Sequence, residues 1–408
     1  MTTDIPSPEV EERVAAVLAA WPVLDGHNDL PEALRSTAGY SVDGLDQQRP
    51  EFQTDLVRLR RGGVGAQFWS AWVPPALPPG QAVQATLEQI DAIHRLIAAY
   101  PERLAFARSG DDVRAAWAGG RLASLIGVEG GHSIGRSAAV LRQFARLGVR
   151  YMTLTHSSNV PWADSGTDEP AAGGLTDEGR AVVALMNELG VIVDLSHVAA
   201  TTMRDALDVT RCPVLFSHSS AFAVTPHPRN VPDDVLERLA ANGGVVQATF
   251  VPSFVSAACW AWQRQAQAHL AELGLAEEAL AGWREAPRPG ESAAQALGRT
   301  AGQAAPHGGR AYAEARAAWE SEHPRPRATI EDVVAHVEHL REVAGVDHVG
   351  LGGDYDGVDR QPEGLRDVTG YPRLLAALAG RGWSDADLAK LTSRNVLRVV
   401  DANPVSCD

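Results

Sequence analysis

Short apolar, β-branched runs alternate with longer stretches of helical periodicity along most of the chain. The apolar runs predict strands, and the periodic stretches predict amphipathic helices between them. Eight strands are expected, at Pro22–Gly26, Gly65–Val73, Leu122–Val128, Val149–Leu154, Val191–Leu195, Pro213–Phe216, Gly244–Thr249 and Val346–Gly352. Helices are expected, among other places, at Val83–Ala99, Ala138–Leu147, Gly179–Leu189 and Ile330–Glu342.

Eight strand–helix alternations in one chain favour an α/β fold, a (β/α)8 barrel of the TIM type. A doubly wound open sheet is the competing architecture. We expect one domain over residues 1–408. The stretch from about 257 to 327 departs from the alternation, because it is rich in Ala, Glu and Arg and is interrupted by Pro287-Arg288-Pro289-Gly290. It predicts a helical insertion between strands seven and eight, acting as a lid, an oligomer contact or a surface decoration.

The composition of the chain limits the classes of binding partner. The 408 residues carry 36 Lys and Arg against 51 Asp and Glu, a formal charge of −15, which argues against nucleic acid and anionic membranes. The first ten residues have neither a basic nor an apolar segment of a signal peptide, and three scattered cysteines predict no disulfide framework. These features predict a cytoplasmic protein.

Polar residues that bind metals or move protons follow most of the predicted strands. In an extended segment alternate residues share a face, so His27 and Asp29 point the same way. The other strand ends carry Glu129, His156, His197, His218 and Asp354. In a parallel barrel these ends lie on one rim.

Imidazoles and carboxylates together on that rim suit a borderline divalent metal such as zinc. A lone strand histidine is more often a hydrogen-bonded core residue, but a ligand-type residue on successive strand ends favours a metal site.

Other polar residues carry weaker signals. Arg229 lies in a Pro-rich loop after the sixth strand, where a guanidinium either clamps a substrate carboxylate or forms an ordinary salt bridge. His94, His269, His336 and His339 lie on helical segments and are expected to be solvated or capping residues, while His132 and His227 are expected to be structural. Nucleophilic serine motifs, phosphate-binding loops and dinucleotide fingerprints are absent from the sequence.

Seven sequence blocks, in order from about residue 21 to about residue 400, resemble those of the membrane (renal) dipeptidase family. The family belongs to the amidohydrolase-type metal barrels. Representative blocks are Asp25-Gly26-His27-Asn28-Asp29, Glu129-Gly130-Gly131-His132, Phe216-Ser217-His218-Ser219 and Gly352-Gly353-Asp354-Tyr355-Asp356. Lipid-anchor and disulfide features of the animal members are not apparent, so the chain resembles a soluble bacterial member.

The resemblance implies a binuclear zinc dipeptidase, a metalloprotease with two Zn²⁺ ions per subunit. By resemblance, His27 and Asp29 bind one ion, His197 and His218 bind the other, and Glu129 bridges them. A hydroxide shared by the ions would attack the scissile carbonyl. His156 would stabilise the oxyanion, Asp354 would transfer the proton to the leaving amine, and Arg229 would hold the substrate carboxylate.

The resemblance also implies a homodimer, and dipeptide substrates that include L-D dipeptides with a D-residue at the C-terminal position. The alternative enzyme is a two-metal amidohydrolase acting on cyclic amides or β-lactams, since the same hydroxide could open such rings. A third reading is a non-catalytic metal-binding or scaffold protein. The intact set of ligand-type residues argues against that reading.

Overall fold

The strands form the centre of the molecule. A computed structural model describes residues 7–275, 280, 283, 287–292, 294–295 and 307–405. Within these residues one parallel sheet contains β1 (Val23–Asn28), β2 (Val64–Trp72), β3 (Leu104–Phe106), β4 (Leu122–Glu129), β5 (Val149–Thr153), β6 (Ile192–Asp194), β7 (Leu215–Phe216), β8 (Val245–Ala248) and β9 (Val349–Leu351). Every strand expected from the sequence is present; β3 was not expected.

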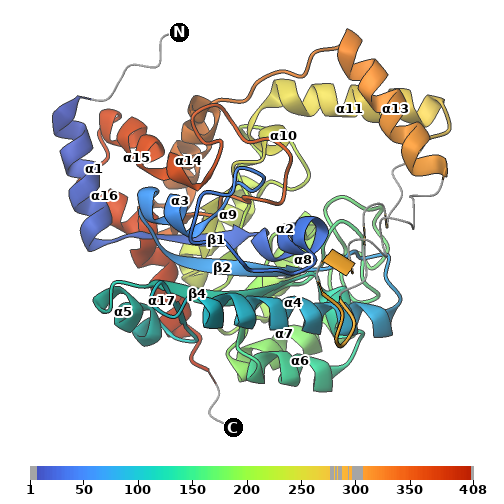
Figure 1. Ribbon diagram of the computed structural model, residues 1–408, viewed down its shortest axis with the longest axis horizontal. Coiled ribbons are helices and arrows are strands. Elements are labelled where there is room, and N and C mark those ends of the chain that lie inside the picture. Colours follow the sequence, from blue (N-terminus) through green and yellow to red (C-terminus); the bar gives the residue numbers. More distant parts are fainter. Residues whose placement is uncertain are drawn as a thin grey trace.

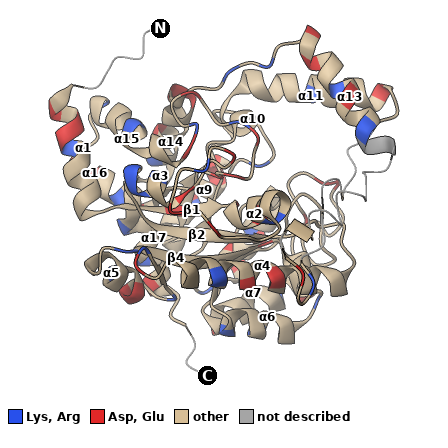
Figure 2. Ribbon diagram, in the orientation of Figure 1, with Lys and Arg blue, Asp and Glu red and all other residues tan. Residues whose placement is uncertain are grey.

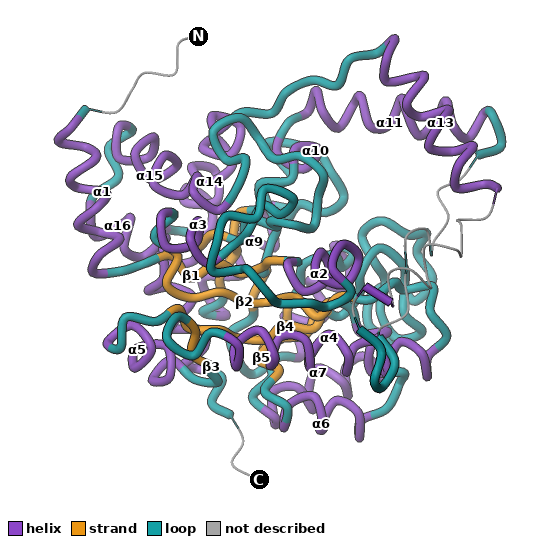
Figure 3. Tube along the Cα trace, viewed as in Figure 1, coloured by secondary structure: helices purple, strands orange, loops and turns teal. Residues whose placement is uncertain are grey.

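The sheet closes on itself. Neighbouring strands follow the order β2-β1-β9-β8-β7-β6-β5-β4, and β2 also pairs with β4, so eight parallel strands form a ring (Figure 3). The short strand β3 lies outside this ring and pairs with the first residues of β4. Ala123 of β4, for example, lies opposite Ala105 of β3 on one edge and Ala66 of β2 on the other. The (β/α)8 barrel is therefore confirmed, and the open doubly wound sheet is wrong.

Helices surround the ring (Figure 1). The helices in the described part of the chain are α1 (Pro8–Ala20), α2 (Leu30–Ala38), α3 (Leu56–Arg61), α4 (Pro79–Ala99), α5 (Gly110–Ala118), α6 (Ala138–Arg146), α7 (Asp177–Leu189), α8 (Ala200–Val209), α9 (Asp233–Asn242), α10 (Pro252–Val255), α11 (Ala257–Glu272), α13 (His307–Glu322), α14 (Ile330–Ala344), α15 (Tyr371–Gly380), α16 (Asp385–Ala389) and α17 (Asn395–Ala402). The four helices named from the sequence correspond to α4, α6, α7 and α14. Helix α4 begins at Pro79 rather than Val83, because Pro is tolerated in the first helical turn.

Local sequence signals fix several helix ends. The Thr176 side chain accepts the N–H of Gly179 at the start of α7, and Gly190 ends that helix with φ 69°. Helix α14 begins with a capping box formed by Thr329 and Asp332. These helices therefore start and stop where backbone groups find side-chain or glycine partners.

Two helices of the segment between β8 and α14 extend away from the barrel. Helices α11 and α13 lie together at one edge of the molecule, apart from the strands (Figure 1). Trp262 and Trp319 pack between them, with ring centroids 5.3 Å apart. Both helices fall in the stretch expected to be a helical insertion, part of which lies outside the described residues.

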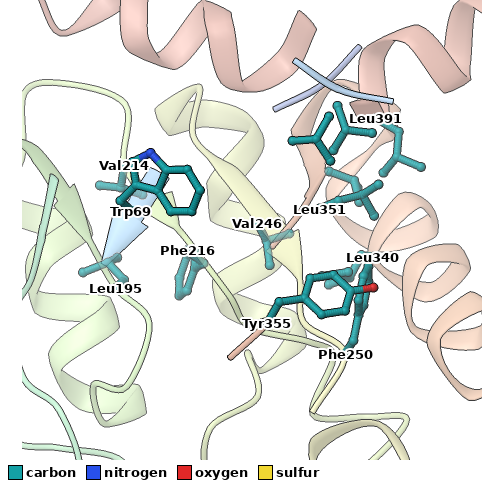
Figure 4. Packing of buried hydrophobic residues seen from close by; sticks show 14 of the residues in the cluster. Trp69, Leu195, Val214, Phe216, Val246, Phe250, Leu340, Leu351, Tyr355 and Leu391 are labelled. Atoms are coloured by element: carbon teal, nitrogen blue, oxygen red, sulfur yellow. The ribbon is translucent and has the colours of Figure 1, made fainter. Parts of the chain in front are cut away.

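Apolar side chains form an outer and an inner core. In the outer core, strand residues such as Phe216 and Val246 pack with helix residues such as Leu340 (Figure 4). In the inner core, side chains of β1, β2, β4, β5, β6, β7 and β8 form one cluster with α17. The inner core fills one end of the barrel, so polar side chains can gather at the other end.

Charged residues are spread over the helices, with Lys and Arg interspersed among Asp and Glu in the view of Figure 2. None of the helices in the described part of the chain combines the length and the apolar character that a membrane crossing requires. Cys212 and Cys259 are free thiols, and Cys407 lies outside the described residues.

His336 on α14 differs from its expected role, because its side chain is completely buried. The N–H of Ala221 donates to His336 Nδ1 over 3.0 Å, and His336 Nε2 lies 3.2 Å from the carbonyl oxygen of Val255. The neutral ring with its proton on Nε2 satisfies both contacts. Burial lowers the pKa of His336 to about 4, since a second proton on Nδ1 would displace the Ala221 N–H.

We expect acid to destabilise the fold through His336. The unfolded histidine takes up a proton below about pH 6.5, while the folded one stays neutral to about pH 4, so stability falls as the pH drops through this window. At pH 5 the cost is about 2 kcal/mol. Urea unfolding of His336→Asn between pH 7.5 and 5 should show a shallower loss than wild type, because Asn keeps an acceptor but does not titrate.

His94→Asn on α4 is the matched control and should retain the wild-type slope. Equal slopes for wild type and His336→Asn would contradict the assignment of the acid sensitivity to this histidine.

Candidate metal centre

The end of β1 carries His27 and Asp29. The Asp25 carboxylate accepts the N–H of His27 over 2.7 Å and the N–H of Gly353 over 3.2 Å, which fixes the strand end against the loop after β9. Asp29 is the N-cap residue of α2, and its Oδ2 lies 3.2 Å from His27 Nε2. The structure thus brings these two side chains together, as the alternation along the strand predicted.

Glu129, the last residue of β4, lies between His27 on one side and His197 and His218 on the other. Its Oε2 is 3.4 Å from His27 Nε2, whereas its Oε1 is 2.8 Å from His197 Nε2 and 3.4 Å from His218 Nε2. The two oxygens of one carboxylate therefore face different partners. Although burial opposes ionisation, the surrounding histidines hold the pKa of Glu129 well below its usual range.

The rings of His27 and His218 are oriented from behind. Tyr151 Oη donates to the carbonyl oxygen of Gly26 over 3.2 Å and so can accept from His27 Nδ1, which lies 2.8 Å away. Similarly, Ser217 Oγ donates to Asp194 over 2.6 Å and lies 2.8 Å from His218 Nδ1. In both rings the Nδ1 proton is held by an oxygen behind the ring, and Nε2 faces Glu129.

Two predicted site residues have left-handed backbone conformations. His197 has φ 71° and Asp354 has φ 56°, values that cost free energy for residues other than glycine. Asp354 lies on the loop after β9, and its carboxylate falls within 4.8 Å of ligand atoms of His27 and Asp29. The fold therefore holds these side chains at the rim by accepting local backbone strain.

Several buried polar atoms of the cluster have no hydrogen-bond partner among the described residues. They are His27 Nε2, Asp29 Oδ1 and His197 Nδ1. Burial alone would lower the pKa of His27, but Tyr151, Glu129 and Asp29 raise it well above its ordinary value. Glu129 and Asp29 therefore favour positive charge at the position of His27.

A metal cation would satisfy His27 Nε2 and Asp29 Oδ1, and imidazole and carboxylate ligands suit zinc. Three overlapping groups of residues each bring their ligand atoms within 4.8 Å of one another. They are His27, Glu129 and His218; Glu129, His156 and His197; and His27, Asp29 and Asp354. The residues present fit a metal centre.

His156 lies at the outer edge of the cluster. Its Nε2 is 3.8 Å from Glu129 Oε1, its ring centroid is 4.3 Å from that of His197, and 19% of its side chain is exposed. Ser165 Oγ donates to the His156 carbonyl over 2.6 Å. Burial lowers the pKa of His156, so the ring is neutral and its exposed edge is available to a ligand.

The Arg229 side chain is buried with an incomplete set of partners. Its terminal nitrogens donate to the His218 carbonyl over 3.2 Å and to Ser219 Oγ over 3.3 Å, while Nε has no partner. None of the carboxylates in the described part of the chain forms an ion pair with it. Burial lowers its pKa to about 10. A buried guanidinium without a counter-ion favours an anionic ligand.

The structure thus gathers all eight site residues named from the sequence at one end of the barrel. Sequence reasoning missed the partners behind them, Tyr151, Ser217 and Asp194. Asp194 and Ser217 lie within the motifs that carry His197 and His218, so the short spacing was a usable signal. Tyr151 lies on β5, far in the sequence from the histidine that it contacts, so no motif around His27 points to it. His132 lies outside the cluster, bonded to the Val73 carbonyl over 2.9 Å.

Comparisons with known proteins identify similar chains. The sequence model of the family described as membrane dipeptidase (peptidase family M19) matches residues 11–405. Dipeptidase verJ of Clonostachys rogersoniana is 38% identical over 400 residues, covering 95% of this chain and 85% of that protein.

Solved structures share the fold. The probable dipeptidase PvdM from Pseudomonas aeruginosa is 24% identical, with a TM-score of 0.79 over 97% of this chain and 99% of that one. A metallopeptidase from Rhodobacter sphaeroides, liganded with a phosphinate mimic of the dipeptide L-Ala-D-Ala, is 24% identical, with a TM-score of 0.71 over 94% of this chain and 99% of that one.

Replacing Ser217 by alanine should weaken metal binding by about 10- to 100-fold, because His218 loses the acceptor that orients its ring. Competition with a chelating dye measures the affinity directly. Ser36→Ala is the matched control, since Ser36 Oγ donates to the Ala33 carbonyl on α2, away from the histidines. Equal affinities for Ser217→Ala and wild type would refute the orienting role.

Proposed function

The chain belongs to peptidase family M19, the membrane dipeptidase family, and on that premise we propose that it is a binuclear zinc dipeptidase acting on free dipeptides. The observation that carries the proposal is the position of the Glu129 carboxylate between His27 on one side and His197 and His218 on the other, together with the buried Arg229, which forms no ion pair with the described carboxylates. A metallopeptidase needs the first feature for its metal. An enzyme restricted to dipeptides needs the second for a free carboxylate.

Five residues would hold the metal. We assign His27 and Asp29 to one ion, His197 and His218 to the other, and Glu129 to both, in keeping with the different partners of its two oxygens. Zinc bound there would lower the pKa of a shared water to supply hydroxide near neutral pH, and would polarise the scissile carbonyl.

Arg229 would select substrate length. A guanidinium binds a carboxylate through two parallel hydrogen bonds, and Arg229 Nε is unpartnered. If the substrate C-terminus is held there, the scissile bond lies one residue away, over the histidine cluster. An additional C-terminal residue would meet the buried surroundings of Arg229, so longer peptides would be excluded.

His156 would stabilise the developing negative charge, and Asp354 would transfer the proton. Ser157 Oγ lies 3.1 Å from His156 Nδ1, so a neutral ring that accepts there carries its proton on Nε2 and can donate to the carbonyl oxygen as negative charge develops. Burial raises the pKa of Asp354 to about 8. A metal cation bound beside it would favour the ionised form, and this carboxylate, more basic than an exposed one, would take a proton from the attacking water and pass it to the leaving amine nitrogen.

We also propose tolerance for a D-residue at the C-terminal position. The support is the related metallopeptidase from Rhodobacter sphaeroides, whose bound phosphinate mimics L-Ala-D-Ala. Exchanging hand at Cα swaps the side chain and the hydrogen but leaves the carboxylate in place for Arg229. A homodimer and a cytoplasmic location remain predictions.

Metal removal should abolish activity and zinc should restore it. We would assay chelator-stripped and zinc-reconstituted protein against Ala-Ala dipeptides with an L or a D C-terminal residue, alongside C-terminally amidated forms. Cleavage restored by zinc, with the amides inert, is the expected result. Two bound zinc ions without cleavage of any dipeptide would overturn the peptidase proposal and favour cyclic amides or β-lactams as substrates.

Arg229→Met should lower kcat/KM for free dipeptides by about 100-fold or more, since the substrate carboxylate loses its counter-ion. The amidated substrate should respond little, because it offers no carboxylate. Arg238→Met is the matched control, as Arg238 is paired with Asp208 on the exposed surface. Equal losses on free and amidated dipeptides would show that Arg229 acts on the fold instead.

A further inference from the structure

We propose that Trp283 and Trp72 form the subsite for the N-terminal side chain of the dipeptide, so that the enzyme favours large apolar residues there. Trp283 belongs to the segment between β8 and α14, outside the (β/α)8 ring. The inference rests on the dipeptidase function proposed above and extends it to substrate selection.

The order of strands in the ring indicates which way a bound dipeptide would lie across the barrel mouth. Four steps separate β2 from β7 in either direction around the closed ring, so their ends lie on opposite sides of the barrel mouth. Arg229 follows β7, while Trp72 is the last residue of β2. A dipeptide with its carboxylate at Arg229 and its scissile bond over Glu129 therefore extends its N-terminal residue toward Trp72.

Trp72 directly adjoins the predicted reaction centre. It lies opposite Glu129 in the pairing of β2 with β4. Its ring packs edge-on against His156, with centroids 5.6 Å apart. Because His156 would face the scissile carbonyl, an indole beside it is positioned to contact the N-terminal residue of the substrate.

Trp283 extends this aromatic surface. Its ring lies edge-on to Trp72, with centroids 6.4 Å apart. The guanidinium carbon of Arg35 lies 3.8 Å from the Trp283 ring centroid, a cation–π contact. Glu32 and Arg35 pair through two short hydrogen bonds, so the cation is itself fixed on α2.

The remaining edge of Trp283 packs against apolar residues. Val73 and Leu77 on the β2–α4 connection and Ala82 and Ala85 on α4 form a small buried cluster, and Trp283 packs on it while remaining partly exposed. A ring held by a cation, an indole and an aliphatic cluster is preorganised. Its exposed part can therefore bind an apolar side chain without first being ordered.

The test compares Phe-Ala, Leu-Ala and Gly-Ala as substrates of wild type, Trp283→Ala and Trp283→Phe. Trp283→Ala should lower kcat/KM about tenfold for Phe-Ala and Leu-Ala, mainly through KM, but less than about twofold for Gly-Ala. Trp283→Phe should recover most of the loss, because it restores an aromatic face. Thermal melts report whether each variant is folded.

Trp319→Ala is the matched control. Trp319 lies on α13 and packs against Trp262, away from the rim, so it should leave the substrate preference unchanged. An equal loss on all three dipeptides in Trp283→Ala, or no loss on any, would overturn the subsite.

Equilibrium binding separates this inference from the catalytic proposal. Calorimetric titration of zinc-loaded protein with phosphinate mimics of Phe-Ala and Gly-Ala measures the preference without turnover. We expect wild type to bind the Phe-Ala mimic about tenfold more tightly, and Trp283→Ala to lose that preference. Absence of the preference in wild type would overturn the subsite, whereas a preference without dipeptide hydrolysis would overturn the catalytic proposal alone.

Discussion

The pairing of β2 with β4 is the contact on which the rest of the molecule depends. Seven residue pairs, from Ala66 with Ala123 to Trp72 with Glu129, join the two ends of what would otherwise be an open sheet. Closure turns a line of strand ends into a ring. Only then do groups from β1, β4, β6 and β7 face one another within hydrogen-bond distance, because a line of strands spaced 4.8 Å apart would separate them.

Gathering these groups costs free energy that the apolar layers offset. Glu129, Arg229 and Asp354 are all buried, and burying charge without full compensation is unfavourable. Hydrogen bonds on the side away from the ligand offset much of this cost. There Asp25, Tyr151 and Ser217 bond to backbone and ring nitrogens of the site. The atoms left without partners point at a ligand, which explains why the stability of the barrel and the chemistry of its mouth oppose one another.

The sequence predicted the barrel well because each barrel strand is a buried apolar run with little ambiguity. It missed β3, since Leu104–Phe106 is three residues long and pairs only at the foot of β4. The site residues could be named because each lies at the C-terminal end of a strand or on the loop after it. Tyr151 was not, because its contact with His27 joins residues of different strands across the barrel. His336 was misread as solvated, because periodicity does not reveal a loop that packs over a helix face.

All eight site residues named from the sequence follow strands of the ring or their connecting loops, whereas Trp283 reaches the rim from a segment that the ring does not need in order to close. Among the described residues, Trp283 contacts the barrel through the Arg35 guanidinium, the Trp72 ring and a small aliphatic cluster. Hydrolysis and selectivity would then be encoded in separate stretches of chain. Related barrels could exchange that stretch, or lengthen it, and so change their substrate preference without altering the catalytic residues.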